Sequence, residues 1–81
     1  MTTLATLTRW MSDYNHAVAP GGECAAWGDY VADCHARLDC APWSDDHADR
    51  VVPADMAEYW TSVADGTCPD YDATDGSRLP Q

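Results

Sequence analysis

The hydrophobic residues of the chain recur mainly at spacings of three and four, which is the period of one buried face of an α-helix. The first series consists of Leu4, Leu7, Met11, Tyr14 and Val18. Thr2 and Thr3 precede it and can cap a helix. The series ends at Ala19-Pro20-Gly21-Gly22, where proline lacks a backbone donor and glycine permits turn conformations. The pattern predicts a helix over about residues 3–18.

A second series predicts a helix over about residues 23–39, which we expect to be the central helix of the fold. Its apolar face consists of Cys24, Trp27, Val31, Cys34 and Leu38. Asp29, Asp33 and Arg37 lie opposite that face, so the outer side is mostly acidic. Glu23 is expected in the first turn, where a carboxylate suits the helix dipole. The short connection to the first helix predicts an antiparallel pair.

The remaining chain predicts a short helical turn, a third helix and a tail. Ser44-Asp45-Asp46 is typical of a helix start, so we expect a turn of helix over about 44–50, with Asp46 placed to pair with Arg50. Pro53 suits the first position of a last helix over about 53–65. The inner face of that helix is expected to consist of Val52, Met56, Tyr59, Trp60 and Val63.

No stretch alternates apolar and polar residues as a strand would, and the chain has no periodicity from Thr67 onward. The sequence therefore predicts a small all-α bundle. Residues 1–66 form its single helical domain, and residues 67–81 form an irregular acidic tail.

The charge of the chain narrows the classes of partner. Fourteen acidic residues face four arginines and no lysine, which gives a formal charge of −10. Nucleic acids and anionic membranes bind basic surfaces, so both are excluded as direct partners, and a basic protein surface is favoured. No apolar run reaches the length of a membrane span, and the first residues lack the features of a signal peptide. A cytoplasmic location is expected.

The four cysteines allow several arrangements. Cys24 and Cys34 are ten residues apart on one helix, hence about 15 Å apart, and a disulfide spans at most about 7 Å between Cα atoms. Any single bridge would therefore join Cys68, in the tail, to Cys24, Cys34 or Cys40. The alternatives are four reduced, core-packed thiols, or a zinc site formed by Cys34, Cys40, His47 and Cys68.

The sequence offers little catalytic chemistry. The polar cluster from Ser44 to Asp49 includes His47, but its carboxylates are explained by a helix start. No glycine-rich phosphate loop, nucleophile elbow or zinc-protease motif is present. We therefore expect no enzymatic activity and no cofactor.

The outer surface carries the functional prediction. Neighbouring carboxylates on a rigid helix can occupy a basic groove that normally binds nucleic acid. Trp43 falls outside the apolar series and is the expected aromatic anchor. The residues expected to contact the partner are Asp29, Asp33, Asp45, Asp46, Asp49, Asp55, Glu58 and Trp43. The alternative is an assembly module that binds through an apolar helix face, with the acidity serving only solubility.

In its composition, very short, acidic and free of lysine, the chain resembles small inhibitor proteins encoded by phages and mobile elements. The anti-restriction and anti-CRISPR proteins that mimic DNA are examples. The resemblance implies a protein that acts in a bacterial cytoplasm, inhibits a nucleic-acid-binding protein and needs no cofactor.

Overall fold

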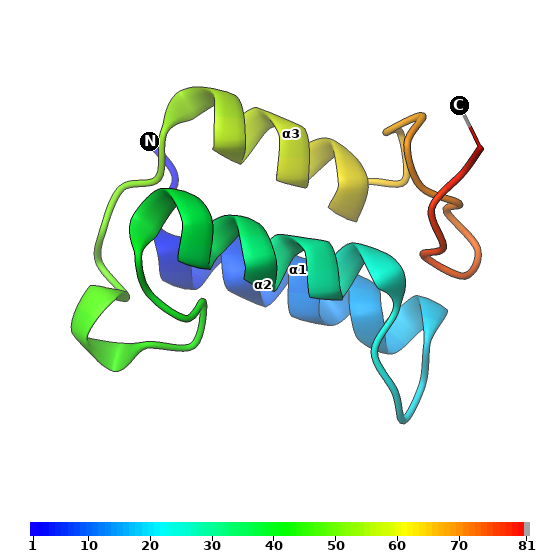
Figure 1. Cartoon of the computed structure of the whole chain (residues 1–81), viewed down its shortest axis with the longest axis horizontal. Coiled ribbons are helices and arrows are strands. Elements are labelled where there is room, and N and C mark those ends of the chain that lie inside the picture. The colour runs from blue at the N-terminus through cyan, green and yellow to red at the C-terminus, as the bar shows by residue number, and fades with distance from the viewer. Residues whose placement is uncertain (81) are drawn as a thin grey trace.

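The structure, a computed structural model, describes residues 1–80 and contains three α-helices and one short 3₁₀ turn (Figure 1). The helices are α1 (Leu4–Val18), α2 (Ala25–Leu38) and α3 (Ala54–Ala64), and the turn η1 spans Asp45–His47. Beyond these elements, the described residues form only two isolated β-bridges and no strand. The predicted all-α bundle is confirmed, with helix ends within about two residues of those expected.

α1 and α2 run antiparallel, and α3 lies beside them (Figure 1). The expectation that the second helix is central is wrong, because α1 makes the most extensive contacts with the other helices. The hairpin turn between α1 and α2 lies at the same end of the bundle as residues 67–80, and the α2–α3 connection lies at the opposite end (Figure 1).

Asn15 fixes the turn between α1 and α2. Its side chain is buried, donates through Nδ2 to Gly22 O at 2.9 Å and accepts through Oδ1 from the Cys24 amide at 2.8 Å. Cys24 is thereby the N-cap residue, and α2 begins at Ala25. Glu23 therefore precedes the helix instead of lying in its first turn, which corrects the prediction.

The buried face of α2 differs from the predicted one. Tyr30 is fully buried, whereas Trp27 and Val31 are only partly buried. A tyrosine can occupy the core here because its hydroxyl lies 2.8 Å from Thr8 Oγ1 and needs no water. The same environment raises the pKa of Tyr30, mainly through desolvation.

α3 presents Met56, Trp60 and Val63 to the core, as predicted. The Trp60 ring lies edge-on to Tyr30, with 5.4 Å between ring centroids. Tyr59 does not join the buried face: its side chain is exposed, and its hydroxyl donates to Asp70 Oδ2 at 2.8 Å. Burial of that hydroxyl and the acidic partner raise the pKa of Tyr59.

The irregular tail packs against the helical core over its described part, residues 67–80. Cys68 and Tyr71 are buried in the same hydrophobic cluster as the helices. Gly76 O accepts a hydrogen bond of 3.0 Å from the Ala26 amide in the first turn of α2. Residue 81, the last of the predicted tail, lies outside the described residues.

Within residues 1–80, no helix is both long and apolar enough to cross a membrane.

Candidate protein-binding surface

The α2–α3 connection, residues 39–53, is held against the N-terminal half of α1. The first amides of an α-helix have no partner inside the helix, and that of Leu4 donates to Arg50 O at 2.8 Å. Thr8 Oγ1 donates to Pro42 O at 3.1 Å. The connection contains little regular structure, but these bonds give it a fixed position relative to α1.

This connection presents an exposed indole beside three exposed carboxylates. The side chain of Trp43 is 64% exposed. Asp45, Asp46 and Asp49 are also exposed, and none forms an ion pair or side-chain hydrogen bond with residues 1–80. The expected pair of Asp46 with Arg50 does not form, because the Arg50 guanidinium donates instead to the last carbonyl of α2 at 2.7 Å. We call Trp43, Asp45, Asp46 and Asp49 the acidic loop.

Asp29 lies on α2 but is used within the chain. It accepts hydrogen bonds from Arg78 Nε at 2.7 Å, from a second Arg78 nitrogen and from the Tyr71 hydroxyl at 2.7 Å. The Arg78 guanidinium, helped by Tyr71, holds the pKa of Asp29 below its usual range. Burial and the Asp29 carboxylate raise the pKa of Tyr71. The three side chains form a latch that fastens the tail to α2.

Asp33 is likewise engaged internally. Its Oδ2 accepts from the indole nitrogen of Trp60 at 2.8 Å and lies 3.8 Å from Arg37 Nη1. The carboxylate therefore satisfies the one polar atom of a buried tryptophan and links α2 to α3. The predicted i,i+4 pair of Asp33 and Arg37 is present, but Asp33 is only partly exposed.

The two candidate carboxylates on α3 differ from each other. Asp55 is paired with Arg37 across α2 and α3 at 2.7 Å, and this guanidinium lowers the pKa of Asp55. Glu58 is exposed and forms no ion pair with the described residues. Of the eight side chains predicted from the sequence, the structure thus gathers four in the acidic loop and commits Asp29, Asp33 and Asp55 to internal contacts.

The basic residues explain why the outside remains acidic. Arg37, Arg50 and Arg78 are each bonded to groups of the chain itself, as described above. Arg9 is exposed on α1. Arg78 and Tyr71 were missed as structural residues, and the available signal was that Arg78 is the one basic residue in an otherwise acidic tail.

The four cysteines are all free thiols, and all are buried. Neither a bridge from Cys68 nor the zinc alternative corresponds to this arrangement: within residues 1–80, no three His, Cys, Asp or Glu side chains lie close enough together to hold a metal ion. Helix geometry separates the thiols, and each packs in the core as a small apolar group. Burial raises the pKa of the Cys34 thiol to about 11, which disfavours the reactive thiolate.

Comparison of the chain with protein-family models, with curated proteins and with solved structures found no match in any of the three.

Proposed function

We propose that this chain is a small non-catalytic inhibitor that binds a basic, nucleic-acid-binding surface of a partner protein through its acidic loop. The observation that supports the proposal is the combination of a 64% exposed Trp43 with three carboxylates that have no partner within the described chain. A tryptophan amid charged groups is typical of an interface anchor.

The internal contacts of the other carboxylates refine where recognition takes place. Asp29 and Asp33 already accept hydrogen bonds from Arg78 and Trp60. Offering either to a partner would break a contact that holds the fold together. We therefore place recognition on the acidic loop and not on the outer face of α2.

The fixed position of the acidic loop favours binding in a second way. Ordering a flexible segment on association costs free energy, and a segment that is already held avoids part of that cost. The hydrogen bonds from the Leu4 amide and from Thr8 hold the loop on both sides of Trp43. Carboxylates in this setting attract a basic groove over long range and can replace nucleic-acid phosphates there. A phage-encoded anti-defence protein is the specific form of inhibitor that we propose.

The test is capture of partners from bacterial lysate on the tagged protein, washed with increasing salt or with competing DNA. The loop variant carries Asp45→Asn, Asp46→Asn and Asp49→Asn. The control variant carries Glu23→Gln, Asp72→Asn and Asp75→Asn, which remove the same charge from the opposite end of the bundle.

We expect a nucleic-acid-binding protein to be retained at low salt and displaced by DNA. The loop variant should lose it, with an affinity at least about tenfold lower, and the control variant should retain it. Equal loss in both variants would show that only net charge matters, and a partner that resists both salt and DNA would favour the assembly module.

A further inference from the structure

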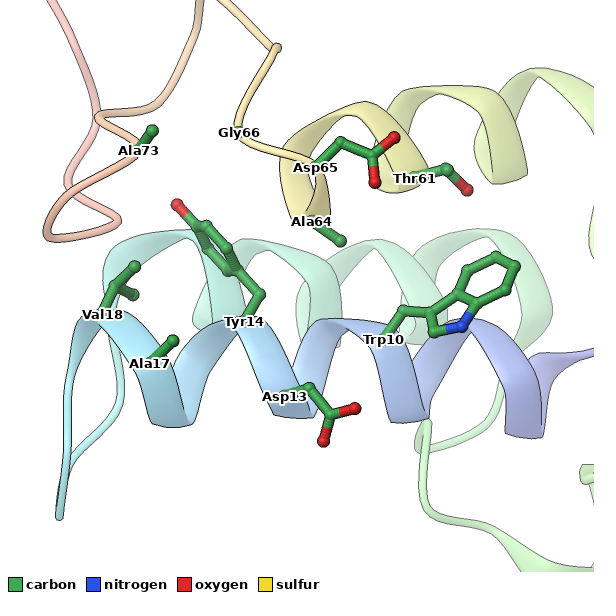
Figure 2. Close-up of a pocket in the computed structure, with 10 residues that line it drawn as sticks. All are labelled: Trp10, Asp13, Tyr14, Ala17, Val18, Thr61, Ala64, Asp65, Gly66 and Ala73. Carbon is green, nitrogen blue, oxygen red and sulfur yellow. The ribbon is translucent and has the colours of Figure 1, made fainter.

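A hollow of about 680 Å³ lies between α1 and the C-terminal half of α3, on residues separate from the acidic loop (Figure 2). A second hollow of similar volume follows α3 on its other side, and Thr61 and Asp65 line both. We call the surface formed by these residues the α1/α3 groove and define it by Trp10, Asp13, Ala17, Thr61, Ala64 and Asp65.

The floor of the groove is made of small side chains. Ala17 on α1 and Thr61 and Ala64 on α3 leave little between the two helix backbones and a body placed on them. How closely two helices approach depends on the side chains at the contact, so such a floor admits another helix at short range. α3 from Ala54 to Asp65 is about 16 Å long, which matches three turns of helix. The three helices thus leave the position that a fourth helix occupies in a four-helix bundle.

The rim of the groove is aromatic and acidic. Trp10 is 38% exposed, and its ring lies at one end of the hollow (Figure 2). Asp13 and Asp65 are exposed and form no ion pair or side-chain hydrogen bond with residues 1–80. No lysine, arginine or histidine side chain lines either hollow.

This charge selects the occupant. A second copy of the chain would bring another formal charge of −10 against these carboxylates, which disfavours self-association. A helix with lysine or arginine beside its apolar strip would place cations near Asp13 and Asp65. One of them could stack on the Trp10 ring, whose face attracts cations.

We propose that the α1/α3 groove binds a short, basic amphipathic helix of a partner protein. The apolar strip of that helix packs on Ala17, Thr61 and Ala64, and its basic side chains face Asp13 and Asp65. The groove and the acidic loop share no residue, so the inference does not depend on the function proposed above.

The probe is a synthetic amphipathic peptide of about 14 residues, with leucine and alanine on one face and lysine and arginine on the other. One control peptide has the same composition in scrambled order, and a second carries glutamate in place of the basic residues. Binding is measured by fluorescence anisotropy of the labelled peptide, and amide chemical shifts of the protein locate the site.

The matched variants are Ala17→Arg and Ala32→Arg. Both alanines are exposed on helices, so both variants should fold and both change the net charge equally. Only the arginine at position 17 fills the groove. We expect Ala17→Arg to weaken peptide binding by at least about tenfold and Ala32→Arg by less than about twofold. Thermal unfolding of each variant confirms that the fold is retained.

The expected pattern is shift changes at Trp10, Asp13, Thr61 and Ala64, with no binding of the glutamate peptide and much weaker binding of the scrambled one. The proposal is overturned if the scrambled peptide binds as well, if both arginine variants behave alike, or if the shift changes map to the acidic loop. It is also overturned if no binding occurs at about 1 mM peptide. A wild-type dimer that Ala17→Arg converts to monomer would assign the groove to a second copy instead.

Discussion

Replacing Gly76 with alanine tests how tightly the tail is fitted to the helical core. Gly76 is buried with φ +70°, and a Cβ atom built there would lie 2.6 Å from Cys24 Cβ, 2.7 Å from Cys24 Sγ and 3.0 Å from Val18 Cγ2. Cys24 Cβ cannot move away without the backbone, because Cys24 is the N-cap residue of α2 and is held by Asn15. The substitution therefore forces the tail away from α2.

Two costs add in the Gly76→Ala variant. A left-handed backbone costs a non-glycine residue about 1–2 kcal/mol, and inserting a methyl group into a packed site costs about 1–3 kcal/mol. The sum, about 2–5 kcal/mol, is large beside the total of about 4–12 kcal/mol that a domain of this length commonly has. The Ala26 amide would also lose its acceptor, Gly76 O.

The assay is urea unfolding followed by circular dichroism, with Gly21→Ala as the control. Gly21 has φ +79° but no atom within 4 Å of its added Cβ, so its variant has the backbone cost without the clash. We expect Gly76→Ala to lower the free energy of unfolding by about 1–3 kcal/mol more than Gly21→Ala does. Equal losses in the two variants would refute the tight fit of the tail.

Three further predictions concern buried polar and titratable groups. Asn15→Ala should lower the free energy of unfolding by about 1–3 kcal/mol, measured by urea denaturation, because it leaves a buried carbonyl and a helix-capping amide without partners. The latch between Asp29 and Arg78 should stabilise the fold fully above the unfolded-state pKa of Asp29, about 4, and lose its effect as the pH falls through the lowered folded-state pKa. Urea midpoints measured from pH 5 to pH 2 should thus fall less steeply in Asp29→Asn than in wild type, and parallel curves would contradict this. All four thiols should resist a thiol reagent at pH 8 until urea is added, Cys34 most strongly given its pKa of about 11, and mass spectrometry after unfolding without reductant should then count four modified cysteines.

The sequence by itself determined the three helices and most of their buried faces. Helix formation depends on neighbours three and four residues away, so the spacing of Leu4, Leu7, Met11 and Tyr14 contains the information that the fold uses. The stop at the proline and glycines after α1 is local in the same sense. For that reason the all-α architecture was predicted correctly.

Only the tertiary structure decided which polar side chains remain available to a partner. Asp29 and Asp33 are indistinguishable from surface carboxylates in the sequence, because their partners, Arg78 and Trp60, are 49 and 27 residues away along the chain. The same distance hides the role of Tyr71 and the tail. Which acceptor faces which donor depends on how the helices and the tail pack together. A local pattern predicts the face of a helix and cannot specify that packing.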